Sequence, residues 1–267
     1  MERIVPASVY QQYNADYSLP FPGQGYGGWK KTDIPIDPEH TAMIVMHAWD
    51  CGTLQTSPAT HRVCEYLPRS QKILSEQFPG FLEAVRKSDL RLIHVGSKTE
   101  KSLPTLRGYI RTEKLNVHES VYEQIPQDET AKKLHRLHTE QVLYGDNAAE
   151  VRRESTKRDF AIMPLEHEDV VCTSDQLFAL CKRDRITHLI YSGFCINACL
   201  TLSPCGWVDM MRHGLICSVI RDLTTAVENK ESCAEERNKA YGLWAFSLWG
   251  GFVFDREDIE AKLLRKA

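Results

Sequence analysis

Short apolar runs that alternate with segments of helical periodicity are the feature that most constrains the fold of this chain. The first two runs, TAMIVMH (41–47) and LRLIHVGS (90–97), flank a segment at 68–89 whose apolar residues have helical spacing. The alternation resumes with apolar runs at 169–173, 187–193, 215–222 and 251–255, and with helical segments at 174–184, 197–213 and 231–249. Continuous apolar runs are typical of parallel strands that are covered on both faces. We therefore predict an α/β fold of three layers, with a central, mostly parallel, Rossmann-like sheet flanked by helices.

Two regions interrupt this pattern. Residues 1–40 contain five prolines and the segment GQGYGG, which argues against a long helix or a central strand. We expect an N-terminal arm that wraps around the domain or around a neighbouring subunit. From about 100 to 165 the chain is charged and has no clean period, apart from a helix expected at 128–139. We interpret this region as an insertion in one domain that spans 41–267.

Composition excludes several classes of partner. The 33 basic and 36 acidic residues leave a net charge of −3 that is spread along the chain, so we expect neither nucleic acid nor an anionic membrane as a partner. The sequence has no signal peptide and no run of about 18 apolar residues, which predicts a cytoplasmic protein. The nine cysteines are odd in number and scattered, which favours reduced thiols over disulfides.

One cysteine lies where a nucleophile would be placed by the predicted fold. In YSGFCINACL (191–200) a strand passes through Gly193 into a helix, so that Cys199 falls in or near the first helical turn. Unpaired backbone N–H groups favour the thiolate there, and they can also hold an oxyanion. Most free cysteines are structural. Cys195 is the rival thiol, and a redox-responsive pair of Cys195 and Cys199 is a further alternative.

Two segments resemble a known family. GFCINAC (193–199) is similar to the G-x-x-[T]-[ND]-x-C signature of the isochorismatase-like cysteine hydrolases, which include nicotinamidases and N-carbamoylsarcosine amidase. The segment at 204–228, PCGWVDMMRHGLICSVIRDLTTAVE, resembles the family pattern that follows the signature. The resemblance covers roughly 41–97 and 165–255. It implies a parallel sheet flanked by helices, usually in an oligomer, and attack of Cys199 on an amide or related carbonyl of a small molecule.

The resemblance also implies the parts of a catalytic site. The peptide bond between Cys195 and Ile196 aligns with a cis bond in the family, and the N–H groups of Ile196 and Cys199 would bind the oxyanion. Some family members bind zinc through Asp and His residues after the second strand, but GSKTEKSLP (96–104) offers neither. We therefore expect no metal and no other cofactor.

Two partners of the family nucleophile are absent from this sequence. His47 stands where the family has an aspartate at the end of the first strand, and Thr173 and Ser174 stand where it has a lysine. In one interpretation His47 replaces the aspartate as the base and Lys98 supplies the positive charge. In the other, the protein is catalytically silent and serves as a binding or scaffold protein.

Residues near these positions are candidates for the wall of a substrate pocket. They are Trp49, Asp50, Phe194 and Asn197, although an aspartate before Cys51 and Gly52 also suits a turn. We predict a cysteine hydrolase that acts on a small amide, carbamoyl or related carbonyl compound, and we expect the insertion to determine its specificity.

Overall fold

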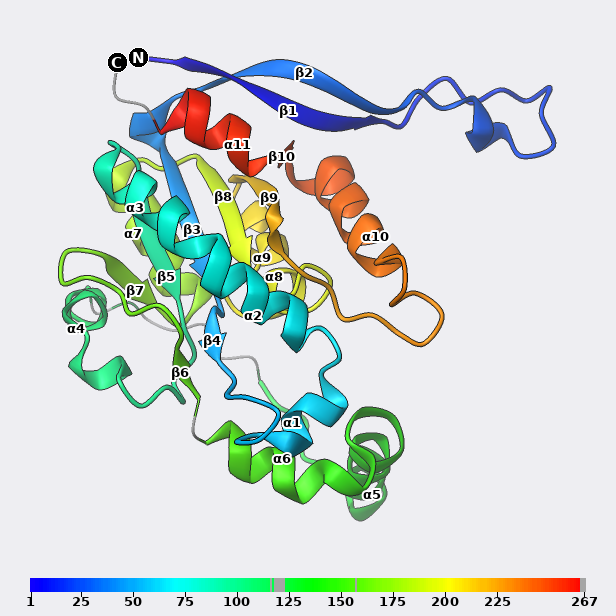
Figure 1. Cartoon of the computed structure of the whole chain (residues 1–267), viewed down its shortest axis with the longest axis vertical. Helices are drawn as coiled ribbons and strands as arrows, with labels where there is room; N and C mark the ends of the chain where they lie inside the picture. The colour runs from blue at the N-terminus through cyan, green and yellow to red at the C-terminus, as the bar shows by residue number, and fades with distance from the viewer. Residues whose placement is uncertain (116, 118–122, 157, 265–267) are drawn as a thin grey trace.

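The computed structural model describes residues 1–115, 117, 123–156 and 158–264, and its core is an eight-stranded sheet (Figure 1). The strand order is β2-β1-β10-β9-β8-β3-β5-β7. In chain order the strands are β1 (Arg3–Gln11), β2 (Gly28–Ile36), β3 (Thr41–Met46), β5 (Arg91–Val95), β7 (Asp169–Val171), β8 (His188–Gly193), β9 (Ile216–Thr224) and β10 (Val253–Phe254). The six strands from β10 to β7 are parallel to one another.

Helices connect these strands and cover both faces of the sheet. They are α1 (Pro58–Val63), α2 (Leu67–Glu76), α3 (Phe78–Lys87), α4 (Arg107–Glu113), α5 (Glu129–His138), α6 (Ala148–Ser155), α7 (Ser174–Asp184), α8 (Cys199–Leu202), α9 (Trp207–Arg212), α10 (Arg237–Ala245) and α11 (Arg256–Asp258). Alternation of strands and helices around a mostly parallel sheet confirms the predicted fold class. No described helix is long and apolar enough to cross a membrane.

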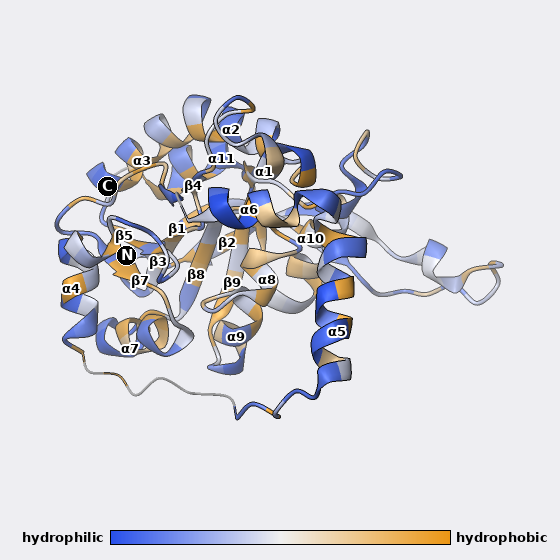
Figure 2. Ribbon diagram, turned by 90° about the horizontal axis from the view of Figure 1, so that it is seen from below, coloured by the Kyte–Doolittle hydropathy of each residue, from blue (hydrophilic) through white to orange (hydrophobic). Residues whose placement is uncertain are grey.

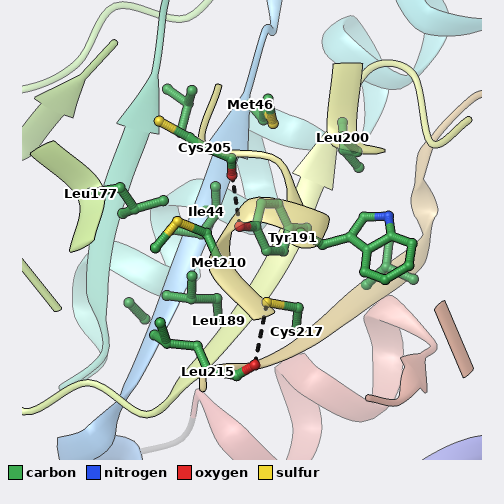
Figure 3. Close-up of a cluster of buried hydrophobic side chains, with 14 of the residues drawn as sticks. Ile44, Met46, Leu177, Leu189, Tyr191, Leu200, Cys205, Met210, Leu215 and Cys217 are labelled. Carbon is green, nitrogen blue, oxygen red and sulfur yellow. Dashed lines mark hydrogen bonds between the residues drawn. The ribbon is translucent and has the colours of Figure 1, made fainter. Parts of the chain in front are cut away.

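The central strand β3 shows why the apolar runs predicted strands. All six of its residues are buried, and the five from Ala42 to Met46 alternate between two hydrophobic cores. Ile44 and Met46 pack with residues of α7, α8, α9 and α10, whereas Met43 and Val45 pack with residues of α2 and α3. Figure 3 shows the first of these cores, in which the buried Tyr191 donates its hydroxyl hydrogen to the carbonyl oxygen of Cys205 at 2.8 Å.

The N-terminal segment forms the outer edge of the same sheet. β1 and β2 are an antiparallel hairpin of nine residue pairs, and Ser8 of β1 pairs with Val253 of β10. Figure 1 shows the loop of this hairpin projecting beyond the helices. Its prolines are compatible with this position, because Pro is tolerated in edge strands. The boundary at residue 40, and the contact with another subunit, stay predictions.

The helix expected over 197–213 is interrupted. α8 ends at Leu202 and α9 begins at Trp207, with Pro204 and Gly206 between them. Pro204 lacks the N–H that a continuous helix would need, and Cys205 adopts a positive φ of 68°. The sequence prediction of one continuous helix was therefore wrong, although Cys199 does begin a helical turn.

The insertion folds back toward the sheet. Figure 2 shows α5 at the outside of the molecule with mostly hydrophilic residues. After α6 the chain forms β6 (Asp159–Phe160), which pairs antiparallel with β4 (Trp49–Asp50). This pairing joins the end of the insertion to the segment that follows β3.

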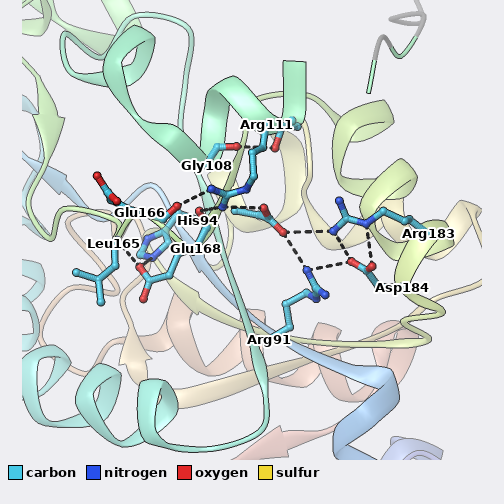
Figure 4. Close-up of polar contacts among 11 residues, drawn as sticks. Arg91, His94, Gly108, Arg111, Leu165, Glu166, Glu168, Arg183 and Asp184 are labelled. Carbon is cyan, nitrogen blue, oxygen red and sulfur yellow. Dashed lines mark hydrogen bonds and ion pairs between the residues drawn. The ribbon is translucent and has the colours of Figure 1, made fainter. Parts of the chain in front are cut away.

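A polar cluster fixes the chain where the insertion ends. The carboxylate of Glu168 accepts hydrogen bonds from His94 of β5 and the N–H of Leu165 (Figure 4). It also accepts from the guanidinium of Arg86 of α3. Asp169, the next residue, pairs with the guanidinium groups of three arginines, Arg91, Arg111 and Arg183. The cluster therefore links the insertion to the first residues of β5 and β7.

Candidate active site

The candidate site lies beyond the carboxyl ends of β3 and β8, where ligands of parallel sheets usually bind. Gly193, the last residue of β8, has a φ of 117°, and a Cβ atom there would lie 1.9 Å from the carbonyl oxygen of Met46. Only glycine tolerates this approach. The residues after β8 are thereby held against the end of β3, and Phe194 donates its N–H to the same carbonyl oxygen at 3.1 Å.

The backbone between β8 and α8 differs from the expectation in two respects. The cis peptide bond joins Phe194 to Cys195, so the expected position one residue later was wrong. The N–H of Ile196 donates to the carbonyl oxygen of Thr225 at 2.8 Å, so it is not a free oxyanion donor as expected. Among the described residues, the N–H groups of Cys195 and Cys199 have no acceptor, which leaves these two donors available.

Cys199 and His47 line one small cavity. Trp49, Cys51, Tyr66 and Phe194 also line it, together with four residues of α2, Leu67, Ser70, Gln71 and Leu74. Its volume is about 30 Å³, enough for roughly one or two water molecules. Of the residues predicted from the sequence, the structure thus brings together Cys199, His47, Trp49 and Phe194. A substrate can enter only if the side chains around this cavity move.

His47 is held in an unusual environment. It is 7% exposed, its φ is 51°, and its ring stacks on Trp49 with ring centroids 4.3 Å apart. Burial lowers the pKa of His47 to about 4, and the charge of Arg158 acts in the same direction, while a hydrogen bond to the Gly96 backbone opposes both. The Nδ1 atom is buried and has no hydrogen-bond partner among the residues that the structure describes. At neutral pH the ring is therefore uncharged, with one nitrogen free to accept a proton.

Cys199 is more exposed than its rival thiol Cys195, and Cys51 and Cys64 share its partial exposure. All nine cysteines are free, and Cys199 is partly exposed at the start of α8. Cys195 is 1% exposed, its sulfur lies 3.6 Å from the hydroxyl of Thr225, and burial raises the pKa of its thiol. Burial also raises the pKa of Cys51, to about 11. Cys199 is thus a better nucleophile than Cys195 on grounds of access.

Three other predicted residues lie outside this cavity wall. Lys98 is exposed in the segment after β5. Asp50 accepts a hydrogen bond from the N–H of Gly52 at 2.9 Å, which is a turn contact. Asn197 donates to the carbonyl oxygen of Val227 and accepts from the N–H of the same residue, both at 2.9 Å, so it fixes the chain after β9.

Thr173, at the position where the resembling family has a lysine, caps the start of a helix. The hydroxyl of Thr173 accepts a hydrogen bond from the N–H of Gln176, whose side chain bonds back to the Thr173 backbone. This capping box starts α7.

Sequence reasoning missed Arg158, which approaches the site from the insertion. Its guanidinium carbon lies 5.3 Å from the centroid of the Trp49 ring. The short apolar run after Asp159 could have suggested a strand, but nothing in the sequence indicates that this strand pairs with β4. Within the described part of the chain, no group of three or more His, Cys, Asp or Glu residues is arranged to hold a metal ion.

Comparisons with known proteins give structural likeness at low sequence identity. No family model and no curated protein matches the sequence. A cysteine hydrolase from Pseudomonas syringae pv. phaseolicola is 12% identical, with 85% of this chain and 93% of that chain covered and a TM-score of 0.47. An isochorismatase-like hydrolase from Alkaliphilus metalliredigens is 16% identical, with 83% and 97% covered and a TM-score of 0.46. The MAR1 ribonuclease from Caenorhabditis elegans is 11% identical, with 84% and 82% covered and a TM-score of 0.42. The activity has to be argued from the site itself.

Proposed function

We propose that the protein is a cysteine hydrolase that cleaves an amide, carbamoyl or related carbonyl bond of a small molecule, with Cys199 as nucleophile and His47 as base. One observation carries this proposal. Cys199, a partly exposed residue, and His47, whose buried Nδ1 has no hydrogen-bond partner among the described residues, line the same cavity beyond the carboxyl ends of β8 and β3. A nucleophile and a base that share a cavity are the minimal requirement for acyl transfer to sulfur.

The reaction has two halves. In the first, His47 Nδ1 accepts the thiol proton while the sulfur forms a bond to the substrate carbonyl carbon. The tetrahedral intermediate then expels its amine, which takes the proton from His47 and leaves an acyl group on Cys199. In the second half, His47 accepts a proton from water as the water oxygen attacks the thioester. The intermediate then releases the acid, and the sulfur takes the proton back from His47.

The electrostatics of His47 favour one version of proton transfer. Because its pKa is about 4, a resting pair of thiolate and imidazolium is unfavourable. The proton therefore moves to Nδ1 as the carbon–sulfur bond forms, which is general-base catalysis. The free N–H groups of Cys195 and Cys199 are the donors that we assign to the developing oxyanion, in place of Ile196.

Hydrolysis of a chromogenic ester tests this proposal. With 4-nitrophenyl acetate we expect the wild-type rate to exceed the rate in buffer, and Cys199→Ala to reduce it to the rate in buffer. His47→Asn should lower the rate by about 10² to 10⁴, the usual contribution of a general base. Cys233→Ala, which removes an exposed thiol, is the matched control and should behave as wild type.

A covalent readout supports the same experiment. Peptide mass spectrometry after rapid acid quenching should find the acetyl group on Cys199 in the wild-type protein. Unchanged hydrolysis in Cys199→Ala would refute the assignment. A wild-type rate equal to that in buffer, with a panel of small amides also uncleaved, would favour the catalytically silent alternative.

The proposal extends to the cellular location and the oligomeric state of the protein. We infer that the protein acts on small molecules in the cytoplasm, which suits nine free thiols, and that it forms a homo-oligomer as the family resemblance implies. Light scattering coupled to size-exclusion chromatography would measure the mass directly, and a mass of 30.6 kDa would mean a monomer.

A further inference from the structure

The insertion places an arginine beside the candidate base. Arg158 precedes β6, and the pairing of β6 with β4 brings it next to Trp49. Its guanidinium carbon lies 5.3 Å from the centroid of the Trp49 ring, and Trp49 stacks on His47. Arg158 and His47 therefore both contact the same aromatic ring.

Arg158 faces a second, larger cavity next to the one that holds Cys199. This cavity has a volume of about 220 Å³, and Cys51 lines both cavities. Its wall includes Gly52 and three residues with hydroxyl groups, Thr56, Ser57 and Thr60. A molecule that reached from one cavity into the other would contact Cys199 at one end and Arg158 at the other.

The two carboxylates that line the same cavity as Arg158, those of Asp50 and Glu154, accept hydrogen bonds from other groups. Glu154 accepts hydrogen bonds from the N–H groups of Ala59 and Thr60 and from the Thr60 hydroxyl, at 3.2, 2.8 and 2.7 Å. Asp50 accepts from the N–H of Gly52. Neither carboxylate forms an ion pair with Arg158, and within the described ranges no other acidic side chain does. A half-buried guanidinium without a carboxylate partner is suited to bind a carboxylate from a ligand, in a planar, bidentate arrangement.

We infer that Arg158 determines specificity by binding a carboxylate of the substrate, so that the protein acts on small carbonyl compounds that carry a negative charge. This inference rests on the proposed function, because it assigns a substrate class to the Cys199 site. Arg158 touches the part of the substrate remote from the reacting carbonyl, and it takes no part in proton transfer.

Alkylation with two reagents of different charge tests the inference without requiring turnover. Iodoacetate and iodoacetamide both transfer a two-carbon group to a thiol with loss of iodide, and they differ in carrying a carboxylate or a neutral amide. We would measure both rates at Cys199 and Cys51 by peptide mass spectrometry. The ratio of the iodoacetate rate to the iodoacetamide rate should fall about three- to tenfold in Arg158→Gln, the scale expected for one nearby half-exposed charge. It should be restored in part by Arg158→Lys.

The controls separate this charge effect from a change in structure. Arg153→Gln removes an arginine of α6 that is exposed and paired with Glu150, so its ratio should equal that of wild type. The ratio in wild type should also fall toward that of Arg158→Gln in 1 M salt, where screening acts within about 3 Å. Melting temperatures would show that the variants are folded.

Each result bears on the inference in a definite way. Equal ratios in wild type, Arg158→Gln and Arg153→Gln would overturn it, and they would leave Arg158 as a cover for Trp49. Absence of alkylation at both Cys199 and Cys51 would also overturn it, because the cavities would then admit no small anion. A fall in the ratio in a protein that hydrolyses no ester would keep the anion site and refute the proposed hydrolysis, so the two failures are distinguishable.

Discussion

Removing the carboxylate of Glu168 tests how firmly the insertion is attached to the sheet. Glu168 is 3% exposed, and it accepts from Arg86 Nε at 2.6 Å, from His94 Nε2 at 2.9 Å and from the Leu165 N–H at 2.8 Å. Removing one partner of a buried ion pair costs about 3 to 5 kcal/mol, because an unpaired charge stays behind. Since the Arg86 side chain is 24% exposed, water reaches it, and we expect the lower value for Glu168→Ala.

Thermal and urea unfolding would measure this loss. About 3 kcal/mol corresponds to a fall in melting temperature of roughly 6 to 12 °C for a chain of this size. Glu166→Ala is the matched control, because Glu166 is exposed and its substitution should change the free energy of unfolding by less than about 0.5 kcal/mol. A Glu168→Ala variant within about 1 kcal/mol of that control at pH 7 would refute the reasoning.

The stability difference between wild type and Glu168→Ala should depend on pH. Burial alone would raise the pKa of Glu168, but hydrogen bonds from His94, Arg86 and Leu165 outweigh it and hold the pKa well below its usual range. A carboxylate with a lowered pKa stabilises the fold above its unfolded value near 4.5, and this stabilisation is lost as the pH falls through the folded value. The difference between wild type and Glu168→Ala should therefore be largest above pH 5 and shrink below about pH 4.

Two further predictions concern stability. Burial lowers the pKa of His47 and of His188 to about 4, so both bind fewer protons when folded, and the free energy of unfolding should fall by roughly 1 to 3 kcal/mol per histidine as the pH drops from about 6.5 to 4. Urea titrations should find a smaller fall in His188→Gln, and an equal fall would contradict this assignment. Gly193→Ala should cost more than about 3 kcal/mol, because its Cβ would lie 1.9 Å from the carbonyl oxygen of Met46. Gly214→Ala, with a φ of 85° and no atom within 4 Å of the added Cβ, should cost only about 1 to 2 kcal/mol, and similar losses in both variants would show that the steric argument fails.

The parts of the fold that were predictable are those fixed by local pattern. Residues 41–47 form a continuous apolar run because β3 is covered on both faces, and the helix predicted at 174–184 is α7 with the same bounds. Cys199 could be placed because a helix start after β8 is a local feature. The break between α8 and α9 was visible in Pro204, but helical spacing on both sides of it led to the wrong prediction.

The remaining features depend on contacts between distant segments. The β1–β2 hairpin needs pairing with β10, and β6 needs β4, more than 100 residues earlier in the chain. A local pattern of apolar residues does not indicate which distant strands pair with each other. The engagement of the Ile196 N–H by Thr225, and the position of Arg158 over Trp49, follow from the same long-range packing, so the sequence predicted neither.

The pairing of β4 with β6 brings a segment of the insertion next to residues that follow a core strand. It joins the insertion to the core through only two residue pairs, Trp49 with Phe160 and Asp50 with Asp159. Cys199 and His47 follow the buried core strands β8 and β3, whereas Arg158 lies in the insertion and is partly exposed. Substitutions at exposed positions of the insertion can therefore change what the cavity accepts at little cost to folding, whereas buried residues such as Val151 and Phe160 hold the insertion in place. Ligand choice can thus change while the proposed nucleophile and base stay where they are.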